Sequence, residues 1–153
     1  MSERCALAVI GGGPAGLATA ITATELGIQV VLFDEQSAPG GQIYRAIEQA
    51  DTAHQAILGQ DYAHGTALAQ SFRASAAGYR SNSDVWAVTR ERQIGVISSG
   101  SAGIVDAQFI VIATGSMERA LPFPGWTLPG VMTAGAGQVF LKQEGMVPDT
   151  SFG

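Results

Sequence analysis

The sequence predicts an α/β fold in which a parallel sheet starts as a βαβ unit and a small antiparallel β-meander is added to it. Short apolar runs end at glycine-rich turns, an alanine-rich segment separates the first two of them, and β-type runs split by Gly and Ser follow later. Such apolar runs are typical of strands buried on both faces of a parallel sheet. At 153 residues and 46% apolar content, the chain suits one domain with a core of its own.

The βαβ unit is expected over residues 4–35. Residues 4–10 (RCALAVI) are apolar and form the first strand. Residues 14–26 (PAGLATAITATEL) form a helix that starts with a proline, which the first turn tolerates, and stops before Gly27. Residues 28–33 (IQVVLF) are mostly β-branched and apolar and form the second strand, so the crossover is expected to be right-handed.

The middle of the chain predicts helices followed by the meander. Residues 43–78 carry enough Ala, Leu, Ile and Gln for two or three helical stretches. Residues 84–107 contain β-type runs at 85–90, 93–98 and 103–105, split by Gly and Ser, which predict antiparallel strands.

Residues 108–153 predict a last strand, a connector and a helix. Residues 109–113 (FIVIA) are fully apolar and form another buried strand. Residues 121–130 (LPFPGWTLPG) are rich in proline, so they form an ordered connector without a helix. Thr133 then caps a final helix that runs to Glu144.

Composition excludes several classes of function. The net charge of -5 disfavours binding to nucleic acid or to anionic membranes. No apolar run reaches the roughly 20 residues that span a bilayer, and no secretory signal is recognisable. The single cysteine, Cys5, forms neither an internal disulfide nor a metal cluster nor a redox dithiol. We therefore expect a cytoplasmic protein without a metal site.

The residues GGGPAG between the first strand and the helix fit the G-x-G-x-x-G pattern of dinucleotide-binding loops. Gly11 permits the tight turn, Gly13 lets the backbone approach a pyrophosphate, and Gly16 lets the helix pack closely on the sheet. The helix that opens with Pro14 and Ala15 directs free N-H groups and its positive dipole end at the phosphates. The context of strand, turn and helix is the one that this pattern requires.

An acidic residue stands where such a site needs one. Asp34 follows Gly16 by 18 residues and ends the second strand. A carboxylate there accepts hydrogen bonds from the ribose hydroxyls of an adenosine and repels a 2′-phosphate, which disfavours NADP. Glu35 can share this role or be a solvated acid. The first half of the chain therefore predicts a Rossmann-like dinucleotide-binding domain.

Two further motifs give the sequence a family resemblance. Ala113-Thr114-Gly115 and Pro39-Gly40-Gly41-Gln42 resemble the "ATG" and glycine-rich loops of glutathione reductase-like flavoproteins, which thread an FAD domain around an inserted NAD(P)-type domain. The resemblance implies that FAD is the cofactor. It also implies that the ATG strand returns near the cofactor, that the GGQ loop runs beside the flavin end, and that Val85 lies beside the adenine. Arg45 contacts the FAD or is a solvated arginine.

Longer stretches resemble a narrower group. GGQIYR, LGQDYAHG, VWAVTRER and PGWTLPGVMTAGAGQ look like the flavin subunits of opine oxidases, hydrogen cyanide synthase and hydroxyproline dehydrogenase. That resemblance implies dehydrogenation of an amine, opine or imino acid at a C-N bond, with hydride transfer to flavin N5. Ala134 and Gly137 stand where thioredoxin reductases carry a C-x-x-C pair, so no disulfide relay is possible. The resemblance instead implies a partner subunit, an iron-sulfur or a quinone-linked electron acceptor, and a possible homo-oligomer.

The sequence thus predicts a set of cofactor-binding residues and assigns no catalytic residue. The predicted cofactor-binding residues are Gly11, Gly13, Pro14, Ala15, Gly16, Asp34, Glu35, Gly40, Gly41, Gln42, Arg45, Val85, Ala113, Thr114 and Gly115. We expect residues 1–153 to be the N-terminal part of a glutathione reductase-like FAD-binding domain that is incomplete, without its inserted NAD(P)-type domain and its C-terminal FAD segment. Two other interpretations stay open, an NAD-binding Rossmann module and a non-catalytic, truncated scaffold module.

Overall fold

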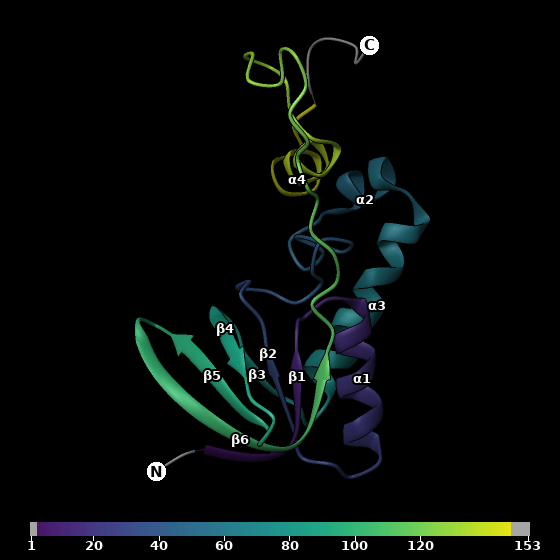
Figure 1. The fold of residues 1–153 in the computed structure, drawn as a ribbon. Helices are drawn as coiled ribbons and strands as arrows, with labels where there is room; N and C mark the ends of the chain where they lie inside the picture. The colour runs from purple at the N-terminus through teal and green to yellow at the C-terminus, as the bar shows by residue number, and fades with distance from the viewer. Residues whose placement is uncertain (1–2, 148–153) are drawn as a thin grey trace.

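The computed structural model describes residues 3–147 and contains one six-stranded sheet in the order β3-β2-β1-β6-β5-β4 (Figure 1). The strands are β1 Glu3–Ile10, β2 Val30–Phe33, β3 Gly78–Arg80, β4 Ser83–Val88, β5 Gln93–Ser98 and β6 Ser101–Ile112. The helices are α1 Pro14–Glu25, α2 Thr52–Leu58, α3 Gln60–Ala74 and α4 Ala134–Glu144. The predicted α/β fold, a parallel sheet with an antiparallel meander, is confirmed.

The βαβ unit forms as predicted. β1 and β2 run parallel, with Leu7 opposite Val30 and Ile10 opposite Phe33. Helix α1 begins at Pro14. Beyond its end, Gly27 takes a φ of +77°, a left-handed conformation that glycine adopts without strain.

Strand β6 corrects one prediction. The runs at 103–105 and 109–113 were predicted as separate strands, one in the meander and one in the parallel sheet, but a single 12-residue strand contains nearly all of both. Its first half pairs antiparallel with β5 and its second half parallel with β1. The polar residue Asp106 breaks the apolar pattern, yet Ala107 beside it is buried and pairs with Cys5, so the strand continues. Figure 1 shows the bend that joins the two halves.

The predicted helical segment 43–78 is only partly helical. Helices α2 and α3 lie within it, separated by Gly59 with a φ of +88°. Residues 43–49 form turns instead, and the segment ends in β3, which pairs parallel with β2. Three residues are too few to carry an alternating pattern, which is why the sequence did not indicate β3.

The last helix and the connector agree with the prediction. Residues 113–133 form neither helix nor strand. The Thr133 side chain caps α4 by accepting a hydrogen bond from the Ala136 N-H at 3.3 Å. Helix α4 has no buried residue and lies beyond the sheet, near α2 (Figure 1).

The core has one apolar cluster on each face of the sheet. In β1, Leu7 and Val9 join the cluster that packs against α1 and Phe72 of α3. The alternate residues Ala8 and Ile10 join the opposite cluster, which the meander strands complete. This arrangement buries β1 on both faces and leaves its carboxyl end free to meet the following loop.

Leu17 and Leu26 give a matched test of this core. Leu17 of α1 is fully buried, whereas Leu26, just past the helix, is 75% exposed. We expect Leu17→Ala to lower the free energy of unfolding by about 2–5 kcal/mol, because it leaves a cavity against the sheet. Leu26→Ala should change it by less than about 0.5 kcal/mol. Urea unfolding followed by circular dichroism measures both, and equal losses would contradict this packing.

Candidate cofactor-binding site

A main cleft of about 610 Å³ lies where the carboxyl ends of β1, β2 and β6 meet. Ile10, Phe33 and Ala113 line it from these strand ends. In open α/β sheets, ligands bind outside the carboxyl ends of the strands. The predicted residues that line this cleft are Gly11, Gly13, Pro14, Ala15, Asp34, Glu35, Gly41, Gln42, Arg45, Val85, Ala113, Thr114 and Gly115.

Gly11 and Gly16 hold the backbone of the glycine loop against the sheet. The Gly11 N-H donates to the Phe33 carbonyl at 2.8 Å, and Gly11 has a φ of +106°. A Cβ at Gly16 would overlap the carbonyl oxygen of Gly11. Gly16 does not line the main cleft. It permits the close approach of α1 to β1, which is the role that the pattern predicts for it.

Gly13 faces open space. A Cβ built at this position meets no atom within 4 Å, and its backbone is extended with a φ of -76°. Gly13 is the N-cap of α1 and provides no side-chain cap, and the first turn holds no acidic residue. The free N-H groups at this end of α1 therefore suit an anion such as a pyrophosphate.

Asp34 is a buried acid at the end of β2, with only 6% of its surface exposed. Its Oδ1 accepts from the Gln36 N-H at 3.2 Å, and its Oδ2 accepts from the Tyr79 hydroxyl at 3.3 Å. Burial raises the pKa of Asp34, while these hydrogen bonds act in the opposite direction. Burial also raises the pKa of Tyr79, which keeps its hydroxyl a donor. The carboxylate is thus fixed in place with capacity for further donors such as ribose hydroxyls.

The GGQ loop folds back onto the glycine loop. The Gly40 N-H donates to the Gly12 carbonyl at 2.8 Å, and a Cβ at Gly41 would lie 2.8 Å from Cα of Gly13. Gly40 has a φ of +131° and does not line the main cleft, so the structure gives it a place in the turn. Gly41 and Gln42 do line it.

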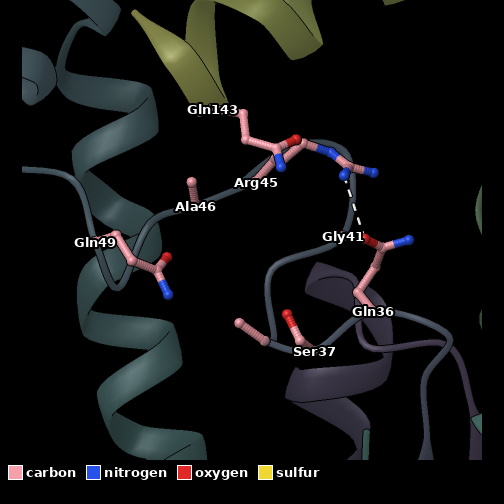
Figure 2. Close-up of a pocket in the computed structure, with 8 residues that line it drawn as sticks. Gln36, Ser37, Gly41, Arg45, Ala46, Gln49 and Gln143 are labelled. Atoms are coloured by element: carbon pink, nitrogen blue, oxygen red, sulfur yellow. Dashed lines mark hydrogen bonds between the residues drawn. The ribbon is translucent and has the colours of Figure 1, made fainter. Parts of the chain in front are cut away.

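Arg45 lies on the wall between the main cleft and a second, smaller cavity. This side cavity has a volume of about 250 Å³ and is lined by Gln36, Ser37, Ala38, Gly41, Arg45, Ala46, Gln49 and Gln143 (Figure 2). One guanidinium nitrogen of Arg45, Nη1, donates to Gln36 Oε1 at 3.2 Å. Its Nε is buried and has no hydrogen-bond partner among the described residues. A buried donor without a partner is costly, so it fits a phosphate or carboxylate oxygen of a ligand.

The ATG residues follow β6 into the main cleft. The Ala113 N-H donates to the Ile10 carbonyl at 2.8 Å, and Gly115 has a φ of +70°. Val85 of β4 lines the cleft as well. The fold thus brings together residues far apart in the sequence, and their contact with a cofactor stays a prediction.

Several residues of the site were not predicted. Gly12 abuts Asp34, because a Cβ there would overlap Oδ2 of that carboxylate, and Tyr79 reaches Asp34 from the unpredicted strand β3. Other unpredicted lining residues are Ile10, Phe33, Gln36, Ile43, Ser83, Asp84, Ser116 and Met117. Gly12 is the middle one of three consecutive glycines, and that run was the signal in the sequence that could have indicated it.

The rest of the described chain offers neither a metal site nor a membrane span. Within residues 3–147, no three His, Cys, Asp or Glu side chains come together to hold a metal ion. Cys5 is a free, buried thiol in β1, and burial raises its pKa. None of the helices in this part is long and apolar enough to cross a bilayer.

The sheet, the glycine loop at the start of α1 and the acid at the end of β2 define a nucleotide-cofactor-binding domain of Rossmann type. The crystal structure of L-proline dehydrogenase from P. horikoshii superimposes with a TM-score of 0.72 at 19% identity, covering 93% of this chain and 29% of that one. The pyridine nucleotide-disulphide oxidoreductase family matches residues 5–144, and the chain belongs to this family.

Two curated relatives resemble this chain over most of its length. An opine oxidase subunit of Agrobacterium tumefaciens is 45% identical over 97% of the chain and 31% of its own length. Hydrogen cyanide synthase subunit HcnB of Pseudomonas aeruginosa is 38% identical over 88% of the chain and 29% of its own length. The resemblance to this group is confirmed. The chain spans less than a third of the length of these relatives.

Asp34→Asn tests whether the buried acid costs stability. Burial raises the pKa of Asp34, so the native state binds the Asp34 proton more tightly than the unfolded state does. The free energy of unfolding therefore falls as the pH rises from below the ordinary pKa of an aspartate to above the raised pKa of Asp34. We expect Asp34→Asn to be more stable than the wild type near neutral pH and to lose this advantage in acid. Urea unfolding at a series of pH values measures the difference.

Glu35→Gln is the matched control for Asp34→Asn, because Glu35 is exposed and also lines the main cleft. It should change the free energy of unfolding by less than about 0.5 kcal/mol near neutral pH. A difference between Asp34→Asn and the wild type that does not vary with pH, or a loss of stability near neutral pH, would contradict the cost of burial.

Proposed function

We propose that this chain binds FAD and forms the N-terminal part of an FAD-dependent oxidoreductase that dehydrogenates an amine, opine or imino acid. The observation that carries the proposal is a single cleft with the features of a dinucleotide site. It contains the uncapped start of α1, the open space at Gly13 and the buried carboxylate of Asp34. The ATG residues and the GGQ loop bound the same cleft.

Each part of the cleft suits one part of FAD. The N-H groups at the start of α1 bind the pyrophosphate, and Gly13 leaves room for it. Asp34 accepts the ribose hydroxyls of the adenosine, and Val85 bounds the cleft from β4. Arg45 offers its unpartnered Nε to an anionic oxygen. The bound flavin supplies hydride acceptance, and the residues of this chain bind and orient it.

The relatives support the class of substrate and partner. Their names include an opine oxidase and an L-proline dehydrogenase, which fits removal of hydride from a carbon next to nitrogen. Two of them are named as subunits, which supports a partner subunit for this protein as well. Cys5 is the single cysteine of these 153 residues and is buried, so this chain provides no thiol relay, and we propose a partner subunit, an iron-sulfur centre or a quinone as the electron acceptor. We place the protein in the cytoplasm.

NAD is the second candidate cofactor, because it shares its adenosine half with FAD. Asp34 and the glycine loop alone would hold the adenosine of NAD equally well. The GGQ loop and the ATG residues extend the cleft beyond that half. Heat release of the bound ligand followed by chromatography separates the two, and release of NAD instead of FAD would overturn the proposal.

Gly13→Val and Gly16→Val make a matched pair. Gly13→Val points its side chain into open space, so the fold should persist while the pyrophosphate is displaced, with a loss of FAD affinity of at least about tenfold. Gly16→Val should unfold the domain, because the side chain meets the Gly11 carbonyl. Flavin absorbance after dialysis and thermal unfolding measure the two effects. FAD binding by Gly13→Val with unchanged affinity would contradict the proposed site.

A further inference from the structure

Helix α4 is tied to the connector at its start, where the Gly135 N-H donates to the Glu118 carboxylate at 2.7 Å, and to residues 42–54 at its end by two further side-chain hydrogen bonds. No residue of α4 is buried and none belongs to an apolar cluster. At its last turn, His54 Nε2 bonds the Leu141 carbonyl at 3.0 Å. Lys142 Nζ donates to the carbonyls of Gln42 and Ile43 at 3.1 Å and 3.0 Å. Lys142 thus bonds two residues that line the main cleft.

The GGQ loop, taken here with the turn that follows it as residues 40–45, is held by hydrogen bonds at both ends and is exposed in the middle. The Gly40 N-H donates to Gly12 at one end, and at the other the Tyr62 hydroxyl donates to the Arg45 carbonyl at 2.7 Å. Between them, Gln42 is exposed and Ile43 is 56% exposed. Across residues 3–147, Lys142 is the only group that donates a hydrogen bond to these two middle carbonyls.

The side cavity lies next to this loop. Gly41 and Arg45 line it from the loop, and Gln143, the neighbour of Lys142, lines it from α4 (Figure 2). The loop and α4 therefore both border this cavity. The Tyr44 N-H bond to the Gly40 carbonyl closes the turn around Gln42 and Ile43, and the Lys142 bonds fix the carbonyls of these two peptides from outside the turn.

Lys142 and Arg45 also place positive charge beside the main cleft. Partial burial lowers the pKa of Lys142, and the nearby Arg45 lowers it further. Neither cation forms a salt bridge with a carboxylate of the described residues, although the chain carries a net charge of -5. An anionic cofactor in the cleft would offset this repulsion.

We propose that Lys142 is a positioning residue that holds the Gln42–Ile43 peptides of the cleft wall and so couples α4 to the cofactor site. The coupling to the cofactor rests on the proposed function, but the effect on the loop does not. Lys142 is the only lysine of the chain, so its substitution removes the single lysine ammonium group of these 153 residues.

Amide hydrogen exchange of the cofactor-free chain tests the effect on the loop. The Tyr44 N-H donates to the Gly40 carbonyl at 3.1 Å and closes the loop, so its exchange rate reports loop opening. We expect Lys142→Met to exchange this proton about tenfold faster than the wild type, a size typical of losing a charged hydrogen bond. Lys142→Arg should stay near the wild type, and His54→Leu, which removes the bond to the Leu141 carbonyl, should accelerate exchange less.

Arg90→Met is the matched control, because Arg90 is an exposed cation in the turn between β4 and β5. It removes the same charge and should leave the Tyr44 exchange rate unchanged. Equal Tyr44 rates in Lys142→Met and Arg90→Met, with both chains folded by circular dichroism, would overturn the proposal. If Lys142→Met does not fold, the rate in His54→Leu is the test instead, and an unchanged Tyr44 rate there would overturn the coupling to α4.

Titration with FAD then tests the coupling to the cofactor. We expect Lys142→Met to weaken FAD binding about tenfold and to change the visible circular dichroism of the bound flavin, while Lys142→Arg restores both. A wild type that binds no FAD would contradict the proposed function, yet the Tyr44 exchange rates would still decide the role of Lys142. Faster exchange with unchanged FAD affinity and an unchanged flavin spectrum would overturn the coupling to the cofactor.

Discussion

Close backbone contact at the glycine loop is the constraint on which the rest of the structure depends. Gly11 bonds the carbonyl of Phe33 at the end of β2, and the carbonyl of Gly12 accepts the N-H of Gly40 from the GGQ loop. Gly16 lies so close to the Gly11 carbonyl that a Cβ would not fit. Because these glycines have no side chains, the ends of β1, β2 and β6 and the start of α1 can approach one another closely. The same absence of side chains leaves the space that a pyrophosphate needs.

Asp34 shows the cost of building a binding site into a core. It is one of two buried polar or charged residues in the described chain, and burial raises its pKa. The Gln36 N-H and the Tyr79 hydroxyl hold its carboxylate by hydrogen bonds, and Gly12 leaves room for it. An apolar or amide side chain would avoid the desolvation cost but would lose a charged acceptor for ribose hydroxyls. The desolvation cost of the buried Asp34 carboxylate is therefore explained by a role in binding.

The sequence predicted the elements whose signals are local and missed those that depend on distant partners. Residues 4–35 carry an apolar run, a proline, glycines and an acid at fixed spacing, so the βαβ unit and its loop could be predicted. Strand β3 and the continuity of β6 through Asp106 depend on pairing with β2 and β1, which no local pattern records. The Tyr79 contact with Asp34 was missed for the same reason. Likewise, nothing near Lys142 indicates that its ammonium meets a loop 100 residues earlier.

The two halves of the main cleft differ in what holds them. Asp34 and the glycine loop stand on buried residues of β1 and β2, including Val9 and Leu32, which are fully buried. The GGQ loop is instead held by turns and by single polar contacts, one of them from a helix without buried residues. Local opening is easiest where few apolar contacts are lost, so we expect the GGQ half to open before the adenosine half. A dinucleotide would therefore find its adenosine side preformed, and its binding energy would be spent on ordering the other side.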